Sequence, residues 1–506
     1  MSLSVAFTRA AIGIQAPLVS VEVHLSNGLP ALSLVGLPET TVKEARDRVR
    51  SAIINSGFTF PAKRITVSLA PADLPKEGGR YDLPIAIAIL AASEQVPAEK
   101  LMRYEFLGEL ALTGALRGVQ GTIPAALAAL DAHRQLILSA DNQHDVGLIR
   151  QGESLIAGHL LEVCAFLQGK PVLQAAQGEP QELLPASGDL NEIIGQQQAK
   201  RALEIAAAGG HNLLFIGPPG TGKTMLASRL NGLMPPLNDR EALESASVAS
   251  LINSSDLQRN WRQRPFRAPH HSASLYALVG GGSLPKPGEI SLAHNGILFL
   301  DELPEFERRA LDALREPLES GEITISRARA KITYPARFQL IAAMNPSPTG
   351  HYRGPHNRTS PQQTLRYLSR LSGPFLDRFD ISLEVPLLPP GTLSNQHHES
   401  ESSQQVRERV ALAREHQLAR CNKMNSAMNN QEIRACCTLL PMDAEWLEQV
   451  MIQLGLSVRA WQRILKVART IADLAGEQTI GREHLTEAVS YRAIDRLLIH
   501  LQNSLN

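Results

Sequence analysis

The chain has only four cysteines in 506 residues, and their spacing matches neither a disulfide framework nor a zinc site built from paired Cys-X-X-Cys motifs. An excess of either charge is also missing, because 50 Lys+Arg balance 50 Asp+Glu and the formal net charge is +0. A nucleic-acid partner would therefore have to bind a local basic surface. These counts exclude a small disulfide-stabilised secreted scaffold and favour a reducing cytoplasmic environment.

Long apolar runs are absent as well. The longest, residues 85–92, falls far short of the ~18 apolar residues that a membrane-spanning helix needs. Arg9 lies among the first apolar residues and no basic lead precedes it, which is not typical of a signal peptide. We therefore expect a cytoplasmic protein with no membrane partner.

Changes in composition divide the chain into parts. Residues 1–168 alternate strand-like and helix-like patterns, including strands at 19–25, 31–35 and 65–69 and helices at 41–56 and 83–92, and predict a compact mixed α/β domain. Prolines and glycines gather in 169–188, which predicts a linker. We expect a second domain at 189–390, a polar linker at 391–405 and a helical domain at 406–506.

A glycine-rich motif follows the apolar strand predicted at 213–216 and precedes a helical stretch. Its residues, in order, are Gly217, Pro218, Pro219, Gly220, Thr221, Gly222, Lys223 and Thr224. This is the pattern GxxxxGK[ST] in a strand–loop–helix context, where backbone N–H groups hold phosphates, Lys223 reaches the β/γ oxygens and Thr224 ligates Mg²⁺. The motif predicts a site for ATP and Mg²⁺.

Two further apolar strands end in polar side chains. Residues 297–300 are followed by Asp301 and Glu302, which would complete the Mg²⁺ shell and polarise the attacking water. Without the phosphate-binding loop, the same pair would read as a helix N-cap after a core strand. Residues 338–344 lead to Asn345, which can align water beside the γ-phosphate or serve as a turn residue before proline.

Taken together, these motifs resemble the AAA+ ATPases, in the branch that includes magnesium-chelatase motor subunits and the MCM helicases. The resemblance makes Asn345 the sensor 1 residue, Arg378 in 373–380 the arginine finger, and Arg459 in 456–460 the sensor 2 residue. It also implies that Ile194 and Gln196 contact adenine. A finger of this kind acts on a neighbouring copy, so the resemblance implies that ATP hydrolysis requires a ring.

The stretches 265–274, 280–282 and 287–296 resemble the ComM/YifB group of magnesium-chelatase-like proteins, and this likeness covers nearly the whole chain. It implies a hexameric motor for branch migration of DNA during recombination and DNA uptake. Three histidines in these stretches, His270, His271 and His294, have no partner spacing typical of metal ligands, so we expect capping and loop packing. Many members of the group carry cysteine pairs after sensor 1; residues 345–350 and 357–360 have none, which predicts no zinc.

Just before sensor 1, residues 322–326 and 331–334 predict a β-hairpin with Arg327, Arg329 and Lys331 at or beside its tip. The resemblance to MCM motors implies a hairpin that lines a central channel, where these cations would grip DNA phosphates. The alternative is a solvated hairpin whose edge is protected by positive charge.

The N-terminal domain resembles the Lon protease domain and its relative in the RadA proteins, through residues 71–84 and 108–114. Lon-type proteolysis needs a serine nucleophile activated by a lysine. In this alignment Arg80 occupies the serine position and Ile123 the lysine position, and neither side chain can perform that chemistry. We therefore predict a catalytically inactive domain, which either contributes a basic face for DNA or binds a protein.

The sequence thus predicts an α/β AAA+ core with a helical lid behind a Lon-like α+β domain, acting as a hexameric ATP-driven DNA motor. Three alternatives stay open: a chelatase-type motor that remodels a metal-inserting partner, an ATP-dependent protease, which the residues at 80 and 123 disfavour, and a non-enzymatic scaffold, which the intact ATPase motifs disfavour.

Overall fold

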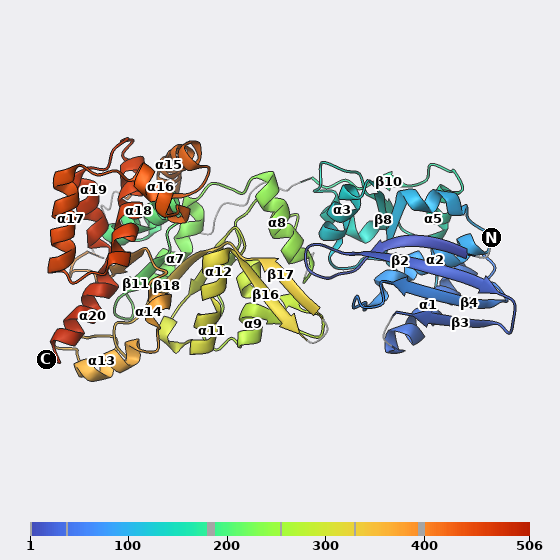
Figure 1. Cartoon of the computed structure of the whole chain (residues 1–506), viewed down its shortest axis with the longest axis horizontal. Helices are drawn as coiled ribbons and strands as arrows, with labels where there is room; N and C mark the ends of the chain where they lie inside the picture. The colour runs from blue at the N-terminus through green and yellow to red at the C-terminus, as the bar shows by residue number, and fades with distance from the viewer. Residues whose placement is uncertain are drawn as a thin grey trace.

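A computed structural model describes residues 3–36, 39–179, 188–252, 256–327, 330–392 and 400–505. The chain runs along the long axis of the molecule in three parts (Figure 1). An N-terminal mixed sheet lies at one end, a parallel sheet with its helices occupies the middle, and a set of helices forms the other end. The predicted α/β class with a C-terminal helical region is confirmed.

The N-terminal part is built on an eight-stranded sheet of order β10-β9-β8-β5-β1-β2-β4-β3. Its strands are β1 Leu3–Arg9, β2 Leu18–Ser26, β3 Ala31–Val35, β4 Arg64–Ala70, β5 Tyr104–Leu107, β8 Gln135–Ser139, β9 Leu155–Ala157 and β10 Gln174–Ala175. Strand β2 alternates buried valines with exposed polar side chains, as the period-2 pattern in the sequence predicts. A separate two-stranded sheet pairs β6 Glu109–Leu110 with β7 Leu116–Arg117.

Helices cover this sheet. They are α1 Glu39–Asn55, η1 Gly79–Tyr81, α2 Asp82–Ala92, η2 Ala98–Arg103, α3 Thr122–Asp131, η3 Ala140–Asn142, α4 Gln143–Val146 and α5 Leu160–Leu167. Every residue of α2 is buried, because the helix lies between the sheet and α1. Arg48 of α1 donates two hydrogen bonds to the fully buried carboxylate of Asp82 at the start of α2, which joins the two helices.

The segment 169–188, expected as a linker, is only partly one. Its residues Gln174 and Ala175 form β10, which pairs antiparallel with β9 and extends the sheet. Backbone pairing at a sheet edge does not require a hydrophobic pattern, so the composition of the segment concealed the strand. Residues 180–187 lie outside the described part of the chain.

The central part contains a five-stranded parallel sheet of order β12-β15-β18-β11-β19. The strands are β11 Leu213–Ile216, β12 Phe266–Arg267, β15 Ile297–Leu300, β18 Gln339–Met344 and β19 Ile381–Glu384. Strand β11 is buried on both faces, between β18 and β19, so its apolar run is that of a central parallel strand. The carboxyl ends of β11, β15 and β18 therefore meet at one edge of the sheet.

Helices and small ribbons surround this sheet. The helices are η4 Leu190–Glu192, α6 Gln197–Gly209, α7 Lys223–Arg229, η5 Leu230–Leu233, α8 Asp239–Ser250, α9 Leu275–Val279, α10 Glu289–Leu292, η6 Leu303–Glu305, α11 Arg308–Ala313, α12 Arg315–Ser320, α13 Pro361–Leu368 and α14 Gly373–Leu376. Two ribbons pair β13 Gly280–Gly281 with β14 Lys286–Pro287, and β16 Glu322–Arg327 with β17 Ala330–Pro335.

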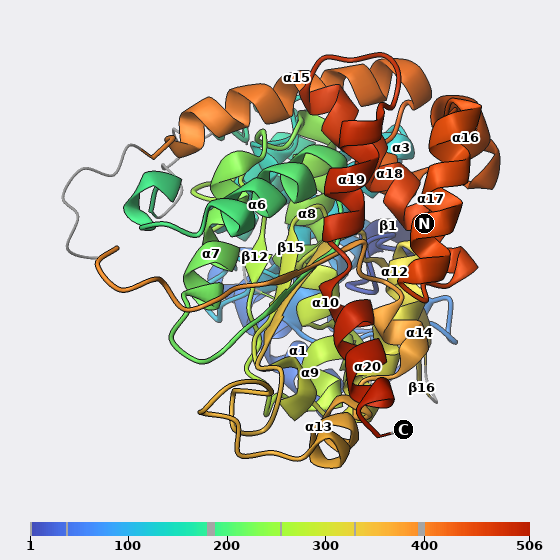
Figure 2. The ribbon, with the colours of Figure 1, turned by 90° about the vertical axis from the view of Figure 1, so that its left-hand side faces the viewer.

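The C-terminal part consists of α15 Ser403–Cys421, η7 Asn425–Ala427, α16 Asn430–Cys436, α17 Pro441–Gln453, α18 Val458–Leu474, α19 Arg482–Ser490 and α20 Ala493–Asn503. Helix α15 lies across α6 and α18 (Figure 2). It begins inside the segment 391–405, because Ser402 caps it with a reciprocal bond to Gln405. Residues 393–399 of that predicted linker lie outside the described part. Helix α20 returns to the central part and packs on α13 and β19.

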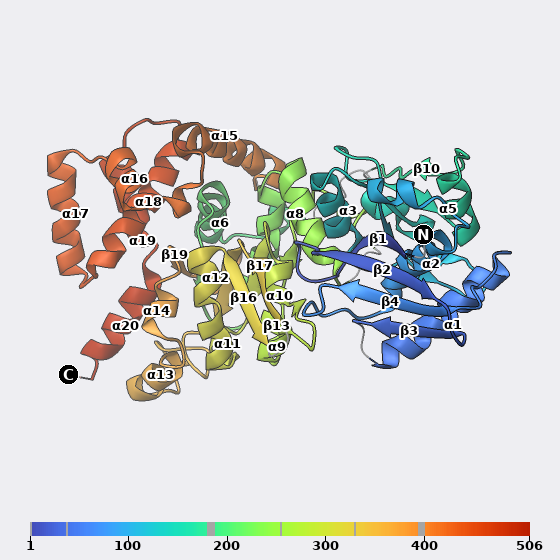
Figure 3. The ribbon, with the colours of Figure 1, turned by 45° about the vertical axis from the view of Figure 1, so that its right-hand side comes forward.

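The N-terminal and central parts share a hydrophobic cluster. Apolar residues of α3 pack with those of α8, which lie side by side in Figure 3. The backbone N–H of Gly121 donates to Ser250 O at 2.8 Å, and Gln120 Nε2 donates to Ile252 O at 2.7 Å. The two parts are therefore joined by a packed contact as well as by the chain. None of the described helices has the length and apolar character to cross a membrane.

Candidate functional site

A pocket of about 440 Å³ lies at the carboxyl edge of the parallel sheet. It gathers residues from three places in the sequence: Pro219, Gly220, Gly222, Lys223, Thr224 and Met225 from the loop after β11, Asp301 and Glu302 from the end of β15, and Met344 and Asn345 from the end of β18. Ligands of parallel α/β sheets bind at this edge. The pocket thus brings together three groups of residues that the sequence analysis predicted: the glycine-rich loop, the acidic pair and Asn345.

The loop after β11 has the backbone needed to wrap an anion. Gly220 and Gly222 adopt φ angles of +81° and +86°, which residues with a side chain rarely adopt. Lys223 begins α7 and is largely buried, and its Nζ donates to Gly217 O, Pro218 O and Asn345 Oδ1 at 2.8, 2.7 and 3.3 Å. Burial lowers the pKa of Lys223, while Asp301 acts in the opposite direction. The ammonium is therefore positioned for a phosphate that enters the pocket.

Two oxygen groups that can ligate a hard cation are in contact in the pocket. Thr224 Oγ1 donates to Asp301 Oδ2 at 2.7 Å, and these are the hydroxyl and carboxylate that suit Mg²⁺ with a bound nucleotide. Glu302 has a left-handed backbone with φ of +53°, and its N–H donates to Asp301 Oδ1. The donor set therefore fits a nucleoside triphosphate with Mg²⁺.

One contact of this site was not predicted. His271 Nδ1 lies 2.9 Å from Glu302 Oε2, so the imidazole holds the carboxylate expected to activate water. His271 comes from the loop after β12, the strand next to β15, and its adjacency to Glu302 depends on that strand order. His270 contacts Ser272, and the buried His294 contacts Glu244 and accepts from Arg337 N–H, as expected for local packing.

The segment expected to contact adenine reaches the loop. Gln196 Nε2 donates to Thr221 O at 3.3 Å and to Pro386 O at 2.9 Å, so it connects the start of α6 to the phosphate loop and to the end of β19. Ile194 lies two residues before it and is half-buried. Gln196 thus contacts the pocket's loop, but neither residue is among those that line the pocket.

Arg378 lies at the other edge of the sheet. It precedes β19, and its carbonyl accepts from Asn212 Nδ2 at 2.9 Å, one residue before β11 begins. The phosphate loop starts where β11 ends, about 13 Å away along a four-residue strand. The Arg378 guanidinium is paired with Glu319 of α12, and burial followed by the neighbouring cations Arg315, Arg463 and Arg459 lowers its pKa. The chain therefore places Arg378 away from its own pocket.

Arg459 lies with Arg378. It is 75% exposed, and its Nη1 donates to Asp377 Oδ2 at 3.1 Å. Arg463, one turn further along α18, donates to Asp377 Oδ1 at 3.3 Å. Arg459, predicted as sensor 2, thus lies beside the segment 373–380 predicted to carry the finger, and it is not among the residues that line the pocket at the phosphate loop.

The predicted hairpin is formed by β16 and β17, in the register Arg327↔Ala330. Ile325 and Ile332 are buried against the central part, whereas Arg327 and Lys331 are exposed at the end of the ribbon. Arg329 lies outside the described residues. The hairpin is therefore anchored by buried apolar side chains, and its exposed end carries the cations Arg327 and Lys331.

The two positions that correspond to the Lon dyad are close in space. Arg80 is 5% exposed, and its Nη1 donates to Gln120 O at 3.1 Å, three residues before the fully buried Ile123. Burial lowers the pKa of Arg80. Neither side chain is a nucleophile or a general base.

The absence of zinc, expected from the residues after Asn345, stays a prediction.

Comparison with known proteins adds three family matches. The model of magnesium chelatase, subunit ChlI, matches residues 189–393. A model of subunit ChlI of Mg-chelatase matches residues 21–142, and one of the ChlI C-terminal region matches residues 400–492. The matches fall on each of the three parts of the molecule.

Individual relatives are similar over different lengths. The chain is 67% identical to an uncharacterised protein of Escherichia coli, YifB, over the full length of both. It is 63% identical to the competence protein ComM of Haemophilus influenzae, over 99% of this chain and 100% of that protein. The magnesium-chelatase 38 kDa subunit of Rhodobacter capsulatus is 26% identical, over 59% of this chain and 86% of its own length.

Proposed function

Because the chain belongs to the magnesium-chelatase ChlI family, in a group with YifB and ComM, we propose that it is a ring-forming AAA+ ATPase that moves DNA. The ring is a hexamer, and each ATP binds between two copies. One copy supplies the phosphate loop, Asp301, Glu302 and Asn345. The neighbouring copy supplies Arg378.

The observation that carries this proposal is the separation of Arg378 from the pocket of its own chain. The pocket follows the carboxyl ends of the strands, whereas Arg378 contacts the residue before β11 at their amino ends. A head-to-tail arrangement of copies brings opposite edges of the sheet together and closes into a ring. Arg459 contacts the finger segment, so we place it with Arg378 on the donating side of the interface.

Hydrolysis in this arrangement uses the groups of the pocket in separate roles. Lys223 binds the β/γ oxygens, and Asn345 aligns the attacking water. Glu302 accepts a proton from that water at Oε2, the atom that now faces His271. Mg²⁺ held by Thr224 and Asp301 would neutralise charge on the phosphate oxygens. Glu302 must leave His271 to act, so the site is active only after a rearrangement.

The DNA substrate is inferred from the relatives and the hairpin. The competence protein ComM aligns with nearly the whole chain, whereas the chelatase subunit aligns with 59% of it. We therefore place branch migration, which extends or resolves heteroduplex joints during recombination and DNA uptake, above remodelling of a metal-inserting partner. The buried Arg80 and Ile123 at the dyad positions support an inactive N-terminal domain rather than a protease.

A strand-exchange assay tests the proposed function. The full-length protein with ATP and Mg²⁺ is mixed with a labelled four-way or three-strand DNA junction, and Lys223→Ala is the matched inactive control. We expect ATP-dependent migration of the branch with the native protein and none with Lys223→Ala. If no junction is processed and DNA leaves ATP turnover unchanged, while a protein with a metal-binding domain stimulates it, the chelatase-type function is correct instead.

The hairpin contact makes a separate prediction. Arg327→Ala combined with Lys331→Ala is expected to weaken DNA binding. It should also lower the slope of log affinity against log salt concentration by the amount expected for about two lost phosphate contacts, because each bound cation releases counterions from the DNA backbone. Basal ATP turnover should persist, since the pocket is not altered. Fluorescence anisotropy with labelled DNA across a salt series measures both quantities. Unchanged affinity and slope would assign the hairpin a purely structural role.

A further inference from the structure

A second pocket, of about 390 Å³, lies in the C-terminal part, far along the sequence from the phosphate loop. One wall is α16 with the turn that follows it, which contribute Asn430, Ile433, Arg434 and Cys437 at the i, i+3, i+4 and i+7 positions of a helical face. The opposite wall is the first turns of α18, with Trp461, Gln462 and Leu465. Leu439 and Ala444, before and in α17, close one end.

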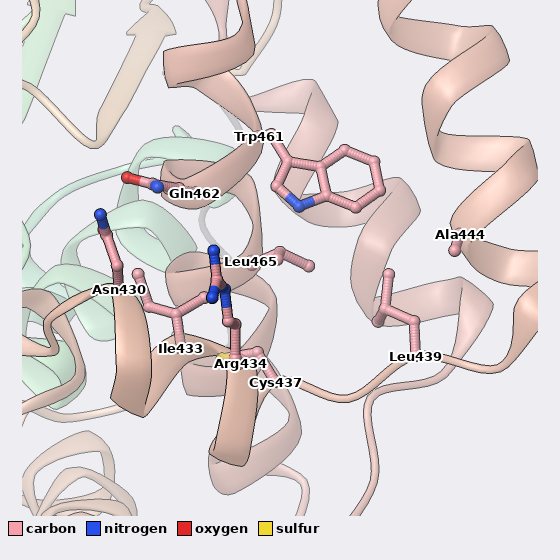
Figure 4. A pocket seen from close by; sticks show the side chains of 9 residues that line it. All are labelled: Asn430, Ile433, Arg434, Cys437, Leu439, Ala444, Trp461, Gln462 and Leu465. Atoms are coloured by element: carbon pink, nitrogen blue, oxygen red, sulfur yellow. The ribbon is translucent and has the colours of Figure 1, made fainter.

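The pocket has two chemically different sides (Figure 4). Trp461, Leu439 and Ala444 line its apolar side, and the indole of Trp461 stands over Leu465. Asn430, Arg434 and Gln462 extend from the two helices on the polar side. A flat aromatic ring can contact the indole while its polar edge faces these side chains.

The polar groups of this pocket are not used elsewhere in the described chain. The side chains of Asn430, Arg434 and Gln462 and the indole N–H of Trp461 make no hydrogen bond or ion pair with another described residue. None of the nine lining residues is acidic, so Arg434 is a cation without a carboxylate in the pocket. Asn430, Arg434 and Gln462 are also exposed, so they are available to a ligand with an anionic group that enters the pocket.

We propose that this pocket binds a nucleotide unit, separately from the ATP site. The base stacks on Trp461, the amides of Asn430 and Gln462 pair with its donor and acceptor edge, and Arg434 binds the phosphate with its planar fork of donors. The volume of about 390 Å³ suits one such unit. The unit is either a free nucleotide or one nucleotide of a single strand. This proposal does not depend on the motor function.

The position of the pocket connects it to the ATPase. Trp461 and Leu465 lie on one face of α18, while Arg459 and Arg463 on another face of the same turns bind Asp377, next to Arg378. A ligand that fixes the orientation of α18 therefore also fixes the arginines beside the finger. Occupancy of the pocket is expected to change ATP turnover without any contact with the phosphate loop.

Binding measurements on the full-length chain test the proposal with two probes. The first is thymidine monophosphate, which lacks the β and γ phosphates that Lys223 is placed to bind; the second is a short single-stranded oligodeoxythymidylate. We expect Trp461→Ala and Arg434→Glu each to weaken binding of a probe about tenfold, the size of a lost stacking or charged contact. Trp461→Phe keeps an aromatic surface and should bind within about threefold of the native protein. Arg366→Glu on α13, at an arginine that is exposed like Arg434 and lies outside the pocket, is the matched charge-reversal control.

The two probes distinguish the source of the nucleotide. A loss seen with thymidine monophosphate indicates a free nucleotide, and a loss confined to the oligonucleotide indicates a DNA strand. Arg434 is exposed, so its reversal stays informative if Trp461→Ala fails to fold in a thermal-unfolding control. The proposal is overturned if neither probe binds, or if both bind the two pocket variants as tightly as the native protein.

Discussion

Arg378→Ala is expected to lower ATP turnover by about 10³ to 10⁵-fold. This is the rate factor that an arginine finger contributes by stabilising charge on the transferred phosphoryl group. Binding of ATP should change less, because Lys223, Thr224 and Asp301 still hold the phosphates and Mg²⁺, whereas the finger acts on charge that develops in the transition state. Steady-state phosphate release and equilibrium nucleotide binding measure the two effects separately. Arg366→Ala, an exposed arginine of α13, is the control for loss of a surface charge.

Arg378 is paired with Glu319 within one chain, which affects how readily it can reach a neighbouring copy. In the single chain the guanidinium is bound to the Glu319 carboxylate, so a neighbouring phosphate must compete for it. An isolated copy has no neighbour to supply a finger, so it is expected to turn ATP over slowly even with every residue intact. Turnover of Arg378→Ala within about tenfold of the native rate would show that the arginine does not stabilise the transition state.

Glu302→Gln is expected to reduce turnover by about 10² to 10⁴-fold while ATP remains bound, because the amide keeps the shape of the carboxylate but cannot accept the proton of the attacking water. The exposed Glu305, three residues further along and paired with Arg370, provides the matched control Glu305→Gln. Phosphate release and ATP binding are again measured together. Native turnover by Glu302→Gln would mean that another group activates the water.

Much of the nucleotide site could be predicted because its residues follow local rules. The glycine-rich loop requires positive φ angles at Gly220 and Gly222, and only a narrow set of sequences allows them. The apolar runs that became β11 and β15 are buried on both faces, which gives a continuous signal. In a parallel sheet the ends of such strands meet at one edge, so the meeting of Asp301 and Asn345 with the loop follows.

The features that were missed depend on contacts between distant segments. The pairing of His271 with Glu302 depends on which strand lies next to β15, and no local pattern specifies strand order. Strand β10 is two residues long and carries no alternation. The side of α18 that faces Asp377 is likewise set by how the C-terminal helices pack on the central part, so the sequence motif around Arg459 gave its residue type but not its neighbour.

The most direct test of the shared ATP site mixes two inactive variants. Lys223→Ala has lost the phosphate loop lysine but keeps Arg378, and Arg378→Ala has the reverse defect. In mixed rings about a quarter of the interfaces join an intact loop to an intact finger, because the contact is head-to-tail. We predict that mixing restores a substantial part of native ATP turnover although each variant alone has almost none. Turnover that stays at the level of the separate variants, in rings shown to exchange subunits, would contradict a site shared between copies.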